Sequence, residues 1–76
     1  MATIMYAGYG SGGSVVDVTA AVAGAYSGGQ REFSASNDLG GDPARVERKY
    51  LFILWSQESA LGSAVTGEED PPVSVP

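Results

Sequence analysis

The segment from Lys49 to Ser56 constrains the fold of this chain more than any other feature. In an extended strand, successive side chains point to opposite faces of a sheet. Alternation separates the segment into two sets, Lys49, Leu51, Ile53 and Trp55 against Tyr50, Phe52 and Leu54. Because both sets are largely apolar, the sequence predicts a strand that is covered on both faces. A helix over residues 45–55 is the alternative, although aromatic side chains would crowd each of its turns.

A chain of 76 residues has little material for two covering layers. A domain of this size buries only about 60% of its extended-chain surface, and small domains usually add disulfides, a metal or a partner subunit. The chain has no cysteine and no histidine, which removes disulfides, thiolate sites and the commonest transition-metal ligand. We therefore expect a homo-oligomer, with a second copy or a ligand closing one face of this strand.

Glycine and serine clusters separate further short β-type runs, a spacing typical of small β proteins. We expect additional strands at residues 3–9, 14–19, 30–36, 60–66 and 73–75, and one helical turn at residues 19–23, capped by Thr19. The predicted fold class is therefore all-β, a small antiparallel β-sandwich of about five or six short strands. Residues 1–76 form a single domain in this interpretation, with residues 67–76 as an edge strand or a tail.

The charge balance narrows the class of partner. The net charge is −5 with four basic residues, and phosphate-backbone binding needs clustered cations, so no nucleic-acid partner is expected. Arg45, Arg48 and Lys49 lie close together and are interpreted as a solvated strand entrance balanced by Glu47, with a small-anion or carboxylate contact as the alternative. The acidic run at residues 68–70 is expected to be a solvated turn.

The lack of a recognisable membrane span or secretory signal in the sequence favours a cytoplasmic protein. No apolar run approaches the roughly 20 residues that span a bilayer, so no membrane span is expected. The segment Met1–Tyr6 lacks the positively charged region of a secretory signal. We expect a cytoplasmic location, and secretion by a route without a signal peptide remains the alternative.

The order of several motifs resembles a known family. The two most specific motifs are the Asp17-Val18-Thr19 box and the Gly41-Asp42-Pro43 turn followed by Lys49. The remaining matching positions are Ile4, Ala7, Tyr9-Gly10, Val15-Val16, Leu39-Gly40, Tyr50-Leu51, Glu68 and Pro76. Over nearly the whole chain, this order resembles the domain of unknown function at the C-terminus of a mitochondrial DnaJ-like co-chaperone, which also occurs as short domains in fungi and bacteria. The resemblance implies a compact β-domain used for interaction, and it implies no activity. The 76 residues include no J-domain, so a chaperone role is not carried over.

Catalytic chemistry has few candidate groups here. Catalysis needs an activated nucleophile or a matched acid–base pair, and no nucleophile-elbow, Ser-x-x-Lys or P-loop motif occurs. Gly8, Gly10 and Gly13 have Gly-x-Gly-x-x-Gly spacing, but a valine-rich strand follows instead of the helix that would hold a pyrophosphate. The sequence therefore predicts that the protein is not an enzyme.

One loop carries oxygen ligands. Asn37, Asp38 and Asp42 lie in a glycine-bearing segment, and Ca²⁺ prefers hard oxygen ligands. Their spacing does not fit an EF-hand, and turns of this composition are common without a metal. We expect no cofactor, with calcium at Asp38 and Asp42 as the alternative.

Aromatic side chains suggest carbohydrate binding. Sugars stack on flat aromatic faces while nearby polar groups satisfy their hydroxyls. Tyr9 and Tyr26 are flanked by glycine and are expected to be exposed, and Asn37 and Asp38 lie in a turn. Trp55 is a further candidate, although a core position is the more expected one. The predicted function is lectin-like recognition by a self-associating β-sandwich. The alternative is a structural or self-assembling interaction protein that uses strand addition and apolar-face contacts with another protein surface.

Overall fold

The chain folds into two antiparallel sheets and one helix. The structure is a computed structural model, and it describes residues 1–36, 38–39 and 48–76. The elements are β1 (Thr3–Ser11), β2 (Ser14–Asp17), α1 (Thr19–Ser27), β3 (Glu32–Phe33), β4 (Tyr50–Gln57), β5 (Ala60–Gly67) and β6 (Val73–Ser74). The larger sheet has the strand order β2-β1-β4-β5, and β3 pairs with β6 in the smaller sheet. The predicted small all-β fold is confirmed.

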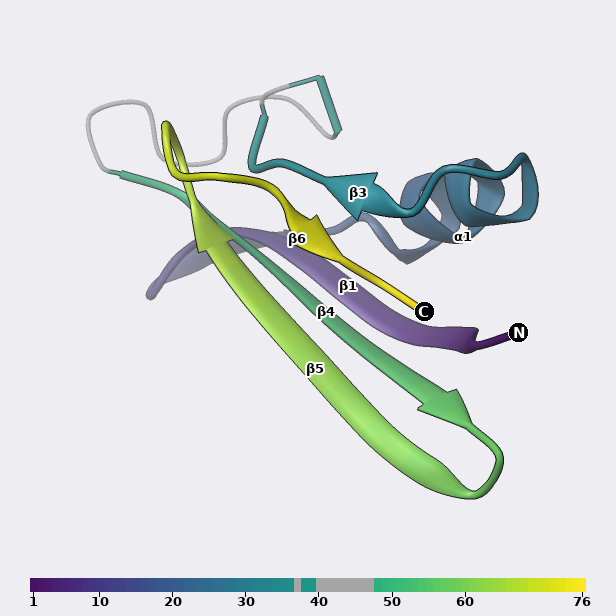
Figure 1. The fold of residues 1–76 in the computed structure, drawn as a ribbon. Helices are drawn as coiled ribbons and strands as arrows, with labels where there is room; N and C mark the ends of the chain where they lie inside the picture. Colours follow the sequence, from purple (N-terminus) through teal and green to yellow (C-terminus); the bar gives the residue numbers. More distant parts are fainter. Residues whose placement is uncertain (37, 40–47) are drawn as a thin grey trace.

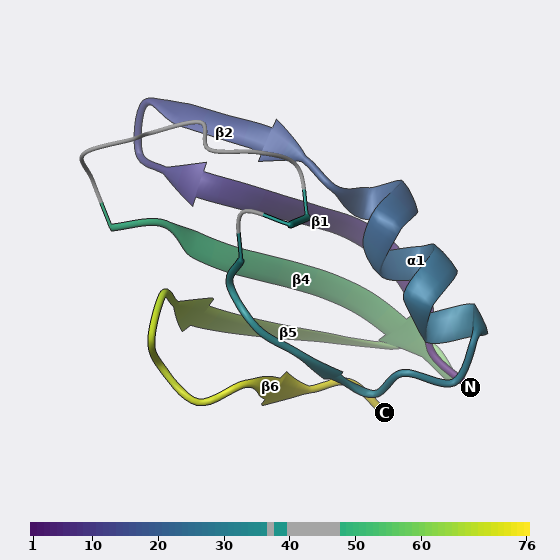
Figure 2. The same ribbon diagram turned by 90° about the horizontal axis from the view of Figure 1, so that it is seen from above.

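All the covering elements lie on one side of the larger sheet. Figure 1 shows α1 and the β3–β6 pair above it, and Figure 2 shows the same elements crossing over its strands. We call the covered side the inner face and the opposite side the outer face. The core between the layers is built from Ala2, Ala7, Tyr9, Val18, Val22, Tyr26, Phe33, Leu51, Ile53 and Val75.

Two tight hairpins set the registers of the larger sheet. Ser11 pairs with Ser14 across the β1–β2 turn. Just before this turn, a Cβ at Gly10 would lie 2.1 Å from the carbonyl oxygen of Ser14, so only glycine lets β2 approach. In the β4–β5 turn, Glu58 and Ser59 both have positive φ, at 51° and 71°. Two successive residues of this kind match the twist that a two-residue hairpin requires.

A β-bulge at Met5 changes which side chains of β1 point to the inner and the outer face. Ile4 pairs with Trp55 while Tyr6 pairs with Leu54, so the register shifts by one residue between them. In a regular strand, residues two apart point to the same face. The residue inserted by the bulge breaks this alternation, so Ile4 and Tyr6 point to opposite faces. As a result Ile4 packs against the core, whereas Tyr6 shares the outer face with Leu54.

The helix is longer than the single turn predicted for residues 19–23. It continues past Gly24 to Ser27 because Val22 and Tyr26, one turn apart on its buried side, pack into the core. Tertiary burial of an apolar stripe stabilises a helix that would be too short alone. The predicted cap at Thr19 is wrong: the N-cap residue is Val18, without a side-chain cap bond. The Thr19 hydroxyl accepts a hydrogen bond from the backbone N–H of Ala7 instead, at 2.9 Å.

The remaining strands differ from the prediction mainly in length. The strand expected at residues 30–36 is limited to Glu32–Phe33, and β1 extends to Ser11 instead of ending at residue 9. The two-residue β3 has one partner, the equally short β6, with Glu32 opposite Ser74. The shortness of that partner limits how far the ladder can extend.

The segment that dominates the sequence is a strand, as predicted, and the helical alternative is wrong. Leu51 and Ile53 on its inner face are 0% exposed, whereas Tyr50 and Phe52 on its outer face are 43% and 38% exposed. One face of β4 is therefore covered by α1 and the β3–β6 pair. In the part of the chain that the structure describes, the other face is open.

Candidate functional site: the outer face of the sheet

The outer face gathers large apolar side chains from all four strands. The strand registers place them in rows that cross the sheet. Their members are Tyr6 of β1, Val15 of β2, Tyr50, Phe52 and Leu54 of β4, and Leu61 and Val65 of β5. Val15, Val65 and Leu61 are 54%, 56% and 70% exposed. Contiguous exposed apolar surface of this kind marks an interaction site more often than a scattered single residue does.

A groove of about 320 Å³ runs along this face over β1. Gly8 and Gly10 form its floor because neither carries a side chain. Tyr50 and Phe52 of β4 form one wall, and Val15 of β2 forms the other. The register explains this arrangement, since Gly8 pairs with Phe52 and Gly10 pairs with Tyr50. Each glycine therefore lies next to an aromatic side chain on the neighbouring strand.

The ring of Tyr6 ends the groove by lying over Gly8. A Cβ at Gly8 would be 2.7 Å from the Tyr6 hydroxyl and 3.0 Å from Val15 Cγ1. Those distances are shorter than ordinary van der Waals contact, so a side chain at position 8 would displace both neighbours. Because Gly8 has no side chain, the Tyr6 ring can lie close to the sheet.

In the described ranges, charged side chains lie at opposite edges of the outer face, Asp17 at one and Arg48 with its partner Asp70 at the other. Asp17 lies on β2, where its Oδ1 accepts a hydrogen bond from the backbone N–H of Thr19 at 2.9 Å. Hydrogen bonds from the Thr19 hydroxyl and then from its N–H lower the pKa of Asp17. Arg48 lies beside Gly67 of β5, pairs with Asp70 at 2.6 Å and stacks on the Tyr50 ring at 5.4 Å. The centre of the face is left uncharged.

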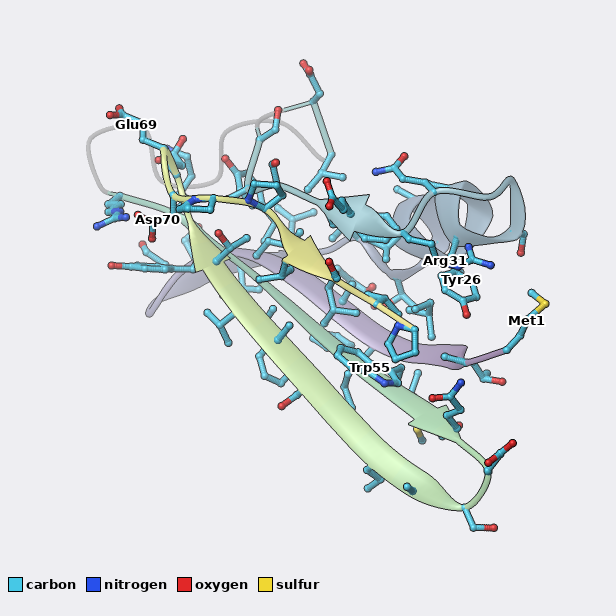
Figure 3. The ribbon with its side chains drawn as sticks, in the orientation of Figure 1. Met1, Tyr26, Arg31, Trp55, Glu69 and Asp70 are labelled. Atoms are coloured by element: carbon cyan, nitrogen blue, oxygen red, sulfur yellow. The ribbon has the colours of Figure 1, made fainter. Side chains whose placement is uncertain are left out.

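The predicted exposure of Tyr9 and Tyr26 is wrong. Tyr9 is 0% exposed and Tyr26 is 3% exposed. Alternation along β1 directs Tyr9 to the inner face, where its hydroxyl donates to Glu68 Oε2 at 3.3 Å. Tyr26 lies on the buried side of α1 and its hydroxyl accepts the N–H of Ala2 at 2.8 Å. Figure 3 shows the Arg31 side chain beside Tyr26, with the guanidinium 3.9 Å from the ring centroid.

The other predicted ligand-binding residues do not come together on one surface. Trp55 lies on the inner face, half-buried against the core, and Figure 3 shows it well apart from Tyr26. Asp38 is exposed, and its backbone N–H donates to Ser36 Oγ at 3.1 Å. Asn37 and Asp42 lie outside the described residues. Of the residues that are described, no three acidic, histidine or cysteine side chains cluster, and calcium at Asp38 and Asp42 stays a prediction.

The basic cluster and the acidic turn are joined, contrary to the expectation that both are solvated. Lys49 is 3% exposed. Its backbone N–H donates to Glu68 Oε1 at 3.0 Å, and its ammonium lies 3.4 Å from the same oxygen. The backbone N–H of Lys49, followed by its ammonium and the Tyr9 hydroxyl, lowers the pKa of Glu68 against an opposing effect of burial. These bonds fasten the turn after β5 to the beginning of β4, and Arg45 and Glu47 lie outside the described residues.

Sequence reasoning found part of the outer face and missed the rest. It grouped Tyr50, Phe52 and Leu54 on one face of the strand, as the structure has them, but it expected both faces to be covered and did not say which one the chain itself would leave open. It placed Tyr6 and Val15 in strands but did not assign them to this face, because their side of the sheet depends on how those strands pair with β4. The usable signal was the alternation of Tyr6, Gly8 and Gly10 with Ala7 and Tyr9.

Comparisons with known proteins give no relative whose function could be compared with this site. No family model, curated protein or solved structure matches the chain. The resemblance to the C-terminal domain of a DnaJ-like co-chaperone therefore stays a prediction. Within residues 1–36, 38–39 and 48–76, no helix is both long enough and apolar enough to cross a membrane.

Proposed function

We propose that this protein is a non-catalytic interaction module that associates with another protein surface through the outer face of its sheet. The observation that carries the proposal is the uncharged, apolar centre of that face, where Tyr50, Phe52 and Val65 remain exposed beside a glycine-floored groove. A chain of this size has few ways to gain stability within itself. Covering this face from outside supplies the burial that the chain lacks. The resemblance to an interaction domain agrees with this class of function.

The magnitudes fit an association of moderate strength. Covering on the order of 400 Å² of apolar surface contributes about 10 kcal/mol at about 25 cal/mol per Å². Association costs about 4–15 kcal/mol in lost translational and rotational freedom. The two quantities are similar in size, so shape complementarity at the groove decides the affinity.

Carbohydrate recognition is the second candidate function. It is favoured by the rings of Tyr6 and Tyr50, which are exposed at the groove and could stack on a sugar. The near absence of polar groups in the described lining weighs against it, since Ser11 supplies the one side-chain hydroxyl apart from the tyrosines. The burial of Tyr9 and Tyr26 removes two of the residues on which the sequence-based hypothesis rested. We therefore place protein association first.

The uncharged dye Nile red tests whether the outer face binds apolar groups. At low protein concentration, the dye is expected to bind the wild-type protein and to lose most of its fluorescence with Phe52→Ser. The control is Ala21→Ser, on the exposed side of α1, which should bind the dye like the wild type. Circular dichroism confirms that both variants fold.

Two results would decide between the candidate functions. A folded protein that neither binds the dye nor associates at any concentration would contradict the proposal. A glycan-array signal that is lost with Tyr6→Ala and Tyr50→Ala, but kept with Ala21→Ser, would favour carbohydrate recognition instead.

A further inference from the structure

We propose that the occupant of the outer face is a second copy of this chain, packed face to face about a two-fold axis that runs parallel to the strands between β1 and β4. This inference rests on the proposed function and adds the identity and geometry of the partner. It follows from how large and small residues are distributed across the sheet. A two-fold interface must be self-complementary, so each feature of the face has to meet its counterpart.

Two rows of the outer face have a glycine of β1 on one side of this axis and an aromatic residue of β4 on the other. In one row Gly8 of β1 lies beside Phe52 of β4, and in the next row Gly10 lies beside Tyr50. The axis exchanges β1 with β4. Tyr50 of each copy then faces Gly10 of the other, and Phe52 faces the Tyr6 ring that covers Gly8. Tyr50 of one copy thus enters the groove of the other, and Phe52 packs against the Tyr6 ring that ends that groove, within the rotation of about 30° that aligned sheets adopt.

Under the same operation the charged groups stay at the edges of the interface, away from its apolar centre. Asp17 marks the β2 edge, and Arg48 lies beside Gly67 at the β5 edge. The axis exchanges these edges, so Asp17 of one copy lies over the β5 edge of the other, where Arg48 is paired with Asp70. The chain carries a net charge of −5, and two copies repel each other wherever acidic surfaces meet. The uncharged outer face is a surface through which like-charged copies can approach.

The available area suits a weak or moderate dimer. Strands lie about 4.8 Å apart and rise about 3.3 Å per residue, so this sheet presents roughly 450 Å² of projected area per copy. Two copies cover roughly 900 Å², and the accessible area of a ridged surface is larger than its projection. Specific interfaces begin at about 1,000 Å². The face is therefore large enough for a reversible dimer when the whole of it is used.

Sedimentation equilibrium from micromolar to millimolar concentration tests the inference. The wild-type mass is expected to rise from monomer to dimer, and the Nile red signal per chain should fall as association covers the face. Val15→Lys and Val65→Glu place charges at opposite edges of the face, at positions that are exposed in the monomer. Each should weaken association by at least about a hundredfold, since an unpaired charge would be buried. Ala21→Lys and Ala21→Glu make the same charge changes on α1, beyond the inner face, and should leave association within about threefold of the wild type.

A comparison of two substitutions at Val65 tests the direction of the axis. Val65 shares a row with Asp17, through Gly8 and Phe52, and the axis places it opposite Asp17 of the second copy. Val65→Lys should therefore weaken association less than Val65→Glu. The reverse order would overturn this axis.

The remaining outcomes separate this inference from the proposed function. A chain that stays monomeric at millimolar concentration, yet binds Nile red through the outer face, overturns the second copy and leaves the proposed function standing. Loss of both signals overturns both. Association that responds to Val65→Glu but not to Val15→Lys would indicate pairing through the β5 edge and would also overturn the inference.

Discussion

The indole of Trp55 lies directly over the backbone of Gly62, its antiparallel neighbour on β5. A Cβ at position 62 would be 2.6 Å from both Nε1 and Cε2 of the ring. An aromatic side chain that covers a cross-strand glycine shields the backbone that the glycine leaves bare. The pair closes the inner face where β4 approaches its hairpin with β5.

Gly62→Ala should therefore lower the free energy of unfolding by about 1–3 kcal/mol, because the added methyl group displaces the indole. Urea denaturation followed by tryptophan fluorescence measures the change, with Trp55 as the single indole of the chain. The control is Gly12→Ala, where no atom of the described residues lies within 4 Å of the new Cβ. Equal effects at both positions would contradict the packing role of Gly62.

Gly24→Ala should stabilise the protein by about 0.5–1 kcal/mol, since alanine loses less backbone freedom than glycine in a helix. Gly24 lies within α1 on its exposed side, and the described structure places no atom within 4 Å of the new methyl group. Thermal unfolding followed by circular dichroism checks the sign of the change. A decrease in stability would argue that the helix ends before Gly24, as the single predicted turn would require.

Tyr26→Phe should destabilise the fold by about 1–2 kcal/mol, because the backbone N–H of Ala2 loses its buried acceptor. Nile red binding should stay unchanged, since Tyr26 does not reach the surface. Tyr50→Phe is the matched control on the outer face and should change stability by less than about 0.5 kcal/mol. Reversed stability effects for the two tyrosines would contradict their assigned positions.

Acid should weaken the fold through Glu68. Its pKa in the folded protein is lowered from an ordinary 4.5, chiefly by the backbone N–H of Lys49. A carboxyl group with a lowered pKa contributes stability above its unfolded pKa, and that contribution is lost as the pH falls through the folded pKa. Melting temperature measured from neutral pH to below 4.5 should therefore fall, and the fall should be smaller in Glu68→Gln. Glu69→Gln removes the same charge from the same turn and should keep the wild-type pH dependence.

Local patterning was enough to predict the class of fold and the main strand. Side chains in residues 49–56 alternate between two faces with a period of two, so β4 and its two faces can be predicted without tertiary information. The length of the chain also indicated that its own residues would not cover both faces, and the second copy or ligand expected there stays a prediction. The strand at residues 3–9 was also predicted, but the face on which Tyr6 lies was not, because that face depends on the bulge at Met5 and on pairing with β4.

The length of α1 and the state of the tyrosines depended on contacts between distant segments. Val22 and Tyr26 extend the helix because the sheet beneath them buries both side chains, and no propensity within residues 19–27 contains that information. Lys49 was predicted to be solvated, yet Glu68, nineteen residues away, neutralises it in a buried position. Sequence proximity indicated Glu47 as the partner of Lys49. Because β5 runs antiparallel to β4 and ends beside its start, Glu68 is the residue that contacts Lys49.

By itself, the sequence determined that the chain is a β protein with one strand apolar on both sides, because that property depends on alternation between neighbouring residues. Only the tertiary structure decided which side is covered. Tyr6 and Tyr9 lie three residues apart on the same strand. The side on which α1 and the β3–β6 pair cross the sheet buries Tyr9 and leaves Tyr6 exposed. That choice depends on how the connections between strands pass over the sheet, a long-range property that no local pattern of residues encodes.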